Sequence, residues 1–268
     1  MRGYAAERIG IAAGGNWVVD RVKIIDRLPA RNMLANIRSE RLSPGGAPAN
    51  VLADLARLQA PFPLTGVGII GDDADGRFIR DTFRRLGVDV SQLETTERAP
   101  TSYTDVMTEE QTGDRSFFHH RGANVLFGPE HVPAEELTCR IFHMGYVLLL
   151  DRMDEPDAEY GTVAARCLCA LKKAGISTSL DLVSEESERY RTLVPPALKY
   201  VDYLIINEIE SGRAAGCKVR TQSGALDGAA LAEAVDALFG LGAMQVVAVH
   251  MPEGAFVRDR TGRSWARG

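Results

Sequence analysis

Cysteine and histidine are scarce in this chain, with four Cys and five His among 268 residues. The cysteines at positions 139, 167, 169 and 217 lack the paired spacing of a zinc site or a disulfide framework. Cys167 and Cys169 lie two residues apart in a segment of helical character, so they point to different sides of it. We therefore expect free thiols that are buried as small hydrophobic side chains, and no zinc centre.

An excess of positive charge and long apolar runs are also missing. The 31 basic and 36 acidic residues give a net charge of -5, whereas nucleic acids and anionic membranes select clustered Lys and Arg. Residues 146–150 form an apolar patch of strand size only, and the N-terminus lacks the apolar core of a signal peptide. These absences argue against nucleic acid or membrane as the main partner and predict a cytoplasmic protein.

Strand-like and helix-like segments alternate along most of the chain, which predicts an α/β fold with a mainly parallel sheet covered by helices. Two β-rich stretches, 17–43 and 101–121, interrupt this rhythm, and the second contains the turn of a hairpin. We expect them to form a separate small sheet. The expected strands are 8–13, 64–70, 141–146, 178–181, 203–206 and 245–250, and the expected helices are 47–58, 73–86, 160–174, 193–198 and 231–239.

The stretch Ser43-Pro44-Gly45-Gly46-Ala47-Pro48-Ala49-Asn50 is the most informative motif. Its two glycines lack Cβ atoms, so a ligand can approach the main chain closely. Asn50 then falls in the first turn of a helix, where a neutral amide beside unpaired N–H groups suits a polyhydroxylated ligand. The alternative is an ordinary junction between a loop and a helix. The helix is expected to face the core through Val51, Leu55 and Leu58.

Six landmarks in the correct order make the chain similar to the PfkB-type carbohydrate kinases, the ribokinase-like family, over nearly its whole length. They are Asn16 with Asp20, Gly45 to Asn50, Gly68-Ile69-Ile70-Gly71-Asp72-Asp73-Ala74-Asp75-Gly76, Gly113-Asp114-Arg115-Ser116-Phe117, Arg121-Gly122-Ala123-Asn124, and Asn207-Glu208-Ile209-Glu210. The resemblance implies one ribokinase-like domain over 1–268. It implies a three-layer α/β/α core with a small β-sheet lid, formed by about 17–43 and 101–121. ATP and Mg²⁺ would be co-substrates for phosphoryl transfer to a sugar-like alcohol.

The resemblance assigns the substrate side of the site. Asp20 on the lid and Asn50 on the helix would hold substrate hydroxyls, because a carboxylate that accepts from hydroxyls is a directional clamp. His119 and Arg121 lie two apart on a strand and so face one side, although a solvent-facing pair is the alternative. Asn124 matches the return from lid to core, or else caps a turn. The implied substrate-binding residues are Asn16, Asp20, Gly45, Gly46, Asn50, His119, Arg121 and Asn124.

The resemblance also assigns the phosphate side. Asn207 and Glu210 match an N-x-x-E motif that follows a strand, where ligands of α/β sheets bind. Glu210 would orient Mg²⁺-bound water, and Asn207 would reach a phosphate. The alternative is a helix N-cap with an acidic first turn. Gly254 is the one glycine retained from a loop that contacts the nucleotide in the family, which here reads Val249-His250-Met251-Pro252-Glu253-Gly254.

Two departures from the family pattern limit what is implied. The Gly-Ala-Gly-Asp segment, whose Asp is the general base of these kinases, does not occur in the 268 residues. We expect that the chain is a truncated kinase whose base lies beyond Gly268. Sugar-acid kinases often have D-x-N-x-R, but residues 181–185 read Asp-Leu-Val-Ser-Glu, which favours a neutral sugar or a nucleoside.

The sequence thus predicts ATP-dependent phosphorylation of a sugar or sugar-like hydroxyl. The alternatives are a nucleoside kinase and a catalytically inactive sugar-binding or regulatory member of the same fold. The resemblance leaves open a homodimer that pairs through the lid.

Overall fold

The computed structural model describes residues 8–242 and 244–268. Its large sheet has nine strands in the order β15-β14-β13-β12-β11-β8-β1-β4-β5. The pairs from β13 through β5 are parallel, and β13-β14-β15 is an antiparallel meander. The strands are β1 Ile11–Gly15, β4 Leu64–Gly71, β5 Asp89–Thr96, β8 Ile141–Val147, β11 Ser177–Leu182, β12 Tyr203–Asn207, β13 Val246–Met251, β14 Gly254–Asp259 and β15 Ser264–Arg267.

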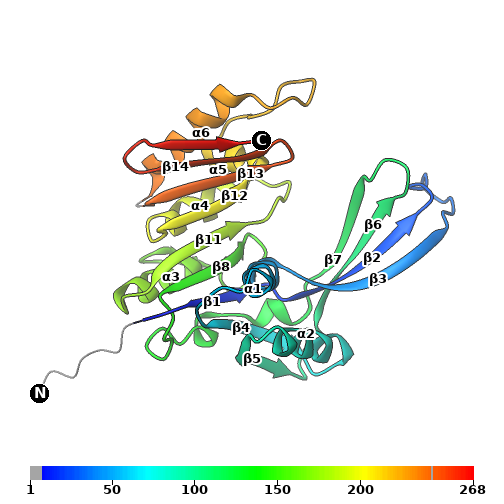
Figure 1. The fold of residues 1–268 in the computed structure, drawn as a ribbon, viewed down its shortest axis with the longest axis horizontal. Helices are drawn as coiled ribbons and strands as arrows, with labels where there is room; N and C mark the ends of the chain where they lie inside the picture. The colour runs from blue at the N-terminus through cyan, green and yellow to red at the C-terminus, as the bar shows by residue number, and fades with distance from the viewer. Residues whose placement is uncertain (1–7, 243) are drawn as a thin grey trace, which may run out of the picture.

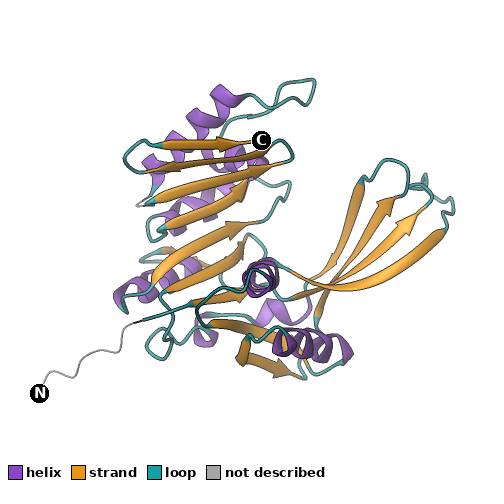
Figure 2. Cartoon of the chain, in the orientation of Figure 1, coloured by secondary structure: helices purple, strands orange, loops and turns teal. Residues whose placement is uncertain are grey.

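Helices cover the two faces of the large sheet unequally (Figure 2). Helices α1 Ala47–Arg57 and α2 Ala74–Arg85 pack on one face over β1, β4, β5 and β8. Helices α3 Val163–Lys173, α4 Tyr190–Leu198, α5 Glu208–Ala215 and α6 Gly228–Leu241 lie on the other. The alternation of strand side chains separates the two cores: Ala12 belongs to the core under α3 to α6, and Ala13 to the core under α1 and α2.

The small sheet projects from the large sheet beside α1 (Figure 1). It has the order β3-β2-β6-β7, from β2 Val18–Ile25, β3 Ile37–Gly45, β6 Ser102–Glu109 and β7 Arg115–His120. Arg21 Nη2 lies 2.6 Å from Asp75 Oδ2 and ties the small sheet to α2. Short 3-10 helices at Gly122–Leu126 and Pro129–His131 and a two-stranded sheet, β9 Pro156–Asp157 with β10 Gly161–Thr162, complete the fold.

These observations confirm the predicted α/β class, with a mainly parallel sheet between helices and a separate small sheet. The sequence analysis missed β5, α5 and the meander β14-β15. The predicted inward stripe of α1 was wrong at Leu58, which ends the helix and is 78% exposed, whereas the predicted Leu55 packs against the core and is partly buried. The buried positions are Ala49 and Leu52, with Ala53 and Ala56 partly buried behind them. Alanines let this short helix approach the sheet closely, so the small side chains face inward.

Cys139, Cys167 and Cys169 are buried free thiols as predicted, but Cys217 is exposed in the turn after α5. Within the described ranges, no helix has both the length and the apolar character needed to cross a membrane.

Candidate active site

Three polar side chains lie side by side across the small sheet, because the strand register places them opposite one another. Asp20 on β2 lies opposite Thr104 on β6, and Thr104 lies opposite His119 on β7. Thr104 Oγ1 is 2.9 Å from His119 Nδ1, which fixes the imidazole ring, while His119 Nε2 is buried without a partner among the described residues. Burial and the nearby Arg121 lower the pKa of His119 to about 4, so the ring is neutral at pH 7.

The start of α1 meets this row. A Cβ atom on Gly45 would overlap the Asp20 carboxylate, so glycine is the residue that leaves room for it. Gly46 has φ +88° and its backbone packs on Asn16, a combination that favours glycine. Burial raises the pKa of Asp20, and the charge of Arg115 partly offsets this effect. The predicted residues Asp20, Gly45 and Gly46 therefore come together.

Tyr146 joins the small sheet, α1 and the large sheet at one point. Burial and the carboxylates of Asp181, Glu210 and Asp20 raise its pKa, whereas a hydrogen bond with the Asn50 side chain lowers it. Burial and Glu210 also raise the pKa of Asp181 at the end of β11. The four side chains that influence the pKa of the phenol come from β2, α1, β11 and α5, so the separate elements approach one another near Tyr146.

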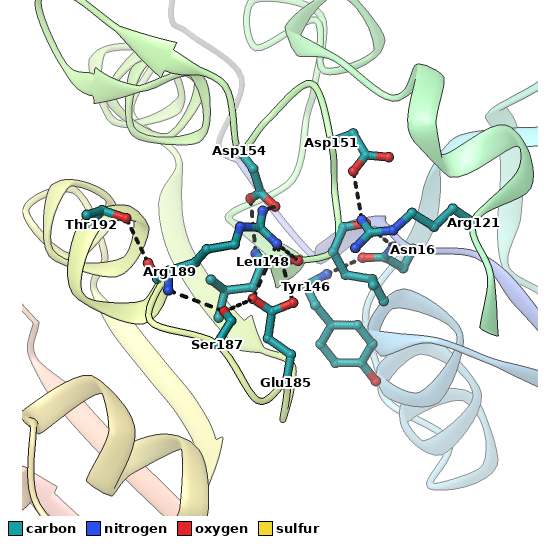
Figure 3. Close-up of polar contacts among 11 residues, drawn as sticks. Asn16, Arg121, Tyr146, Leu148, Asp151, Asp154, Glu185, Ser187, Arg189 and Thr192 are labelled. Atoms are coloured by element: carbon teal, nitrogen blue, oxygen red, sulfur yellow. Dashed lines mark hydrogen bonds and ion pairs between the residues drawn. The ribbon is translucent and has the colours of Figure 1, made fainter. Parts of the chain in front are cut away.

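The loop that follows β8 is held by side chains from three elements (Figure 3). Tyr146 N donates to Asn16 Oδ1 over 2.5 Å, and Asn16 Nδ2 donates to Leu149 O over 3.2 Å. Arg121 Nη1 pairs with Asp151 at 2.8 Å. Arg189, just before α4, pairs with Asp154 at 2.8 Å and donates to Leu148 O. Burial raises the pKa of Asp154 to about 6 despite this pair.

The side chains of Asn16 and Asn124 form hydrogen bonds with backbone groups. Asn124, at 1% exposure, accepts from Trp17 N at 3.3 Å and donates to Trp17 O at 3.2 Å. Asn16 is fully buried and holds the loop after β8 as described above. Both residues therefore fix the position of the chain on either side of the small sheet, and the predicted contact of each with substrate stays a prediction.

The N-x-x-E pair forms a reciprocal cap on α5. Asn207 Oδ1 accepts from Glu210 N at 2.8 Å, and Glu210 Oε2 accepts from Asn207 N at 2.9 Å. Ser184 Oγ donates to Glu210 Oε1 at 2.8 Å and accepts from Asn207 Nδ2 at 2.7 Å. Burial raises the pKa of Glu210, whose residue is only 4% exposed. Asn207 is thus the N-cap of α5, as the alternative interpretation predicted, and the same hydrogen bonds fix the orientation of the Glu210 carboxylate.

Gly254 lies apart from the Tyr146 cluster but at the same edge of the large sheet. It opens β14, where a Cβ atom would overlap the backbone of Arg267. Arg220 bridges Glu208 at the start of α5 and Glu253 beside Gly254, with contacts of 2.6 to 2.9 Å. The guanidinium group of Arg220 therefore links the start of α5, through Glu208, to the turn after β13, through Glu253.

Sequence reasoning missed Tyr146, Asp181 and Ser184 as site residues. Tyr146 and Asp181 are the last residues but one of β8 and β11, and Ser184 follows β11, at the edge where side chains converge in a parallel sheet. Their position near a strand end could have marked them as candidates. The sequence does not show, however, which residues near the ends of β8 and β11 face the site. Across residues 8–242 and 244–268, no three His, Cys, Asp or Glu side chains group closely enough to hold a metal ion.

Comparison with known proteins decides the family. The profile of the pfkB family carbohydrate kinases matches residues 11–265. The chain belongs to this family. The chain is similar to the ATP-dependent ribose-1-phosphate kinase of Halopiger xanaduensis, with 31% identity over 65% of this chain and 53% of that one. The aminoimidazole riboside kinase of Salmonella typhimurium is 38% identical over 56% of this chain and 44% of that one.

Solved structures show the same fold at lower identity. Ribokinase from Giardia lamblia matches with a TM-score of 0.78 and 19% identity, over 97% of this chain and 76% of that one. Arabidopsis thaliana ribokinase, complexed with ribose and ATP, matches with a TM-score of 0.74 and 21% identity, over 97% and 78%. The predicted membership of the pfkB family is confirmed. The chain spans about half the length of the curated relatives it matches.

Proposed function

We propose that this pfkB family chain binds a neutral sugar or nucleoside and takes part in its ATP-dependent phosphorylation. The observation that carries the proposal is that Asp20, Asn50 and Asp181 lie near the partly buried Tyr146. Asp20 packs on Gly45 just before α1, and Asp181 and Ala47 of α1 both pack on Gly145. The three polar side chains are hydrogen-bonding groups in a partly buried site, as recognition of several hydroxyl groups requires. Relatives named as kinases of fructose and aminoimidazole riboside support this substrate class, and a relative named as a kinase of ribose 1-phosphate gives the phosphorylated alternative.

The charge of the site favours the uncharged acceptors among these. Asp20, Asp181 and Glu210 all lie near enough to raise the pKa of Tyr146, and His119 is neutral at pH 7 because its pKa is about 4. The prediction that Arg121 shares a strand with His119 was wrong, because β7 ends at His120 and Arg121 caps the following 3-10 helix, where it pairs with Asp151. A phosphorylated acceptor would bring negative charge toward three carboxyl groups. We therefore assign the acceptor as a neutral sugar, such as fructose, or a riboside.

In the proposed reaction, the acceptor hydroxyl gives up its proton and takes the terminal phosphoryl group of ATP, and ADP leaves. Asp20 accepts hydrogen bonds from acceptor hydroxyls, and Asn50 can both donate and accept. The small sheet acts as a lid that excludes water and so limits ATP hydrolysis. The general base stays unassigned within this chain, because the sequence contains no Gly-Ala-Gly-Asp segment.

The residues at the start of α5 fit a magnesium ion held through water. Glu210 is a buried carboxyl group with a raised pKa and Asp181 close by, and a divalent cation would relieve this crowding of negative charge. Mg²⁺ keeps several waters and uses one or two carboxylates with substrate phosphates. When bound, the ion would neutralise charge on the phosphates. Ser184 and Asn207 would keep the Glu210 carboxylate oriented.

Calorimetric titration with fructose, ribose, ribose 1-phosphate and adenosine tests the acceptor site. We expect a neutral compound to bind, and Asp20→Asn to weaken it at least about ten-fold, because a charged hydrogen-bond acceptor is lost. Asp54→Asn, an exposed carboxylate on α1, serves as the control and should bind as the parent does. Equal affinity in Asp20→Asn, or tighter binding of ribose 1-phosphate, would contradict the proposal.

The alternative left open by the sequence is sugar binding without phosphoryl transfer. Release of ADP on addition of the bound sugar, followed in a coupled assay, separates the two. Sugar-stimulated release supports the kinase, whereas saturable binding without release, also after the chain is extended to supply a Gly-Ala-Gly-Asp segment, supports the binding protein. A homodimer through the small sheet stays a prediction.

A further inference from the structure

A cavity of about 550 Å³ lies between the start of α4, helix α5 and the turn 216–220. Its volume falls in the range of sites for small organic ligands. Ile209, Gly212, Arg213 and Gly216 line it from α5. None of the acceptor-site side chains around Tyr146 lines this cavity.

Helix α5 separates the cavity from the capped Asn207–Glu210 pair. Ile209, Arg213 and Gly216 are spaced four and three residues apart, so they share one side of the helix. Glu210 instead bonds Ser184 and Asn207. The cavity and the proposed phosphate side of the active site therefore share a helix but use different sides of it.

The cavity is positively charged in a protein of net charge -5. Four basic residues and one acidic residue line it: Arg191, Arg213, Lys218, Arg220 and Glu188. Arg220 is neutralised by Glu208 and Glu253, and Arg191 pairs with Glu188 at 3.4 Å. In the part of the chain that the structure describes, neither Arg213 nor Lys218 has a carboxylate partner. Two positive charges thus remain for an anion.

Arg213 also contacts the loop that holds the active-site cap. Its Nη1 donates to Glu185 O at 2.6 Å, and its guanidinium lies 5.9 Å from the centroid of the Tyr190 ring. The neighbouring Ser184 bonds both Asn207 and Glu210. Guanidinium has five N–H donors, so Arg213 can keep the Glu185 bond and still bind an anion.

We propose that this cavity binds a phosphorylated small molecule through Arg213 and Lys218. Phosphate suits the pair, since a guanidinium offers it two parallel donors and an ammonium a point charge. The volume accommodates the organic part of a phosphorylated sugar or a nucleotide as well as the phosphate. The bound anion holds Arg213 against Glu185 and so restricts the motion of the loop 184–187. Because Ser184 in this loop bonds Glu210, the anion also restricts Glu210, and the cavity is a regulatory site beside the proposed active site.

Calorimetric titration of the full chain with inorganic phosphate, ribose 5-phosphate and ADP tests the proposal. We expect at least one probe to bind, with Arg213→Gln and Lys218→Gln each weakening it about ten-fold through loss of a charge-assisted contact. Lys199→Gln, an exposed lysine at the end of α4, should bind as the parent does. Comparison of the three probes distinguishes a phosphate site from a phosphosugar or nucleotide site.

Hydrogen exchange gives a second readout that does not need activity. The bound probe should slow amide exchange at 184–187 and 207–210 in the parent and leave it unchanged in Arg213→Gln. Asp20→Asn should bind the probe normally, so failure of the acceptor site would not be mistaken for failure here. Unchanged affinity in both cavity variants, or no binding of any probe at about 10 mM, would overturn the proposal.

Discussion

Buried titratable side chains are the main residue-scale feature of this protein. His143 on β8 is 3% exposed, with Nδ1 2.9 Å from Ser179 Oγ and Nε2 unpartnered among the described residues. Burial lowers its pKa to about 4. The unfolded chain therefore binds more protons at this position than the folded protein between pH 4 and pH 6.5, and stability is lost as pH falls through this interval.

His143→Gln should flatten this part of the stability profile. Between pH 6.5 and pH 4, the parent should lose on the order of 3 kcal/mol more unfolding free energy than the variant. Urea denaturation at the two pH values measures the difference. Asp154, whose raised pKa is about 6, acts with the opposite sign but equally in both proteins. Parallel profiles for parent and variant would show that His143 is not the titrating group.

Gly45→Ala tests the contact between α1 and the acceptor carboxylate. The added Cβ atom would overlap Asp20, so acceptor binding should weaken at least about ten-fold, with little backbone strain because φ at Gly45 is not positive. Gly240→Ala is the matched control, since a Cβ there meets nothing within 4 Å. Calorimetry on both variants decides: if they bind alike, Asp20 has room to move and Gly45 is not required.

At the scale of elements, the small sheet depends on how its ends are joined to the core. The chain enters it at Trp17, whose backbone N–H and C=O are both bonded by the Asn124 side chain. Asn124 lies in the 3-10 helix that follows β7, at the exit from the sheet. One buried amide therefore joins the entry and exit of a sheet whose strands are far apart in sequence.

Asn124→Ala should destabilise the protein by about 1 to 3 kcal/mol, because it leaves two buried backbone groups of Trp17 unpaired. The free energy of unfolding in urea measures this loss. Gln111→Ala, at an exposed turn of the small sheet, is the control and should change stability by less than about 0.5 kcal/mol. A loss for Asn124→Ala no larger than that of the control would mean that water replaces the amide.

At the scale of the whole molecule, the large sheet has an exposed apolar row on one face. Strand register places Ile205, Ala248, Val257 and Trp265 directly opposite one another across β12 to β15. Ile205 is 43% and Trp265 52% exposed, whereas Leu204 and Val247 on the other face are fully buried under helices. In Figure 2 the helices beside β12 to β15 lie on one side of the sheet only.

The double variant Ile205→Thr with Trp265→Ser should bind less of the dye ANS, which reports exposed apolar surface. We expect the fluorescence of the dye to fall and the stability to change little, because the replaced side chains are exposed. Leu58→Ser, at an exposed leucine outside the row, should leave the fluorescence near that of the parent. Similar fluorescence for the double variant and the parent would show that the row does not bind the dye.

The sequence predicted the α/β class and the separate small sheet because these depend on local patterns. Strands and helices can be recognised in the sequence where their apolar residues repeat with the period of that element, and glycine motifs mark the junctions between elements. The same periodicity placed part of the buried side of α1 wrongly: it included the exposed Leu58 with the partly buried Leu55 and left out Ala49 and Leu52. Only the close approach of α1 to β1, β4 and β8 selects the small side chains.

By itself, then, the sequence determined the alternation of strands and helices, the pfkB family and the residues Asp20, Asn50, Asn207 and Glu210 as a set worth testing. Tertiary structure alone decided that Tyr146, Asp181 and Ser184 stand among them, that Asn16 and Asn124 bond backbone, and that Arg213 and Lys218 share a cavity. The physical reason is that a sequence motif reflects the backbone conformation that a few neighbouring residues must adopt. Burial, charge and pairing depend instead on which distant side chains the strand order brings within a few ångströms.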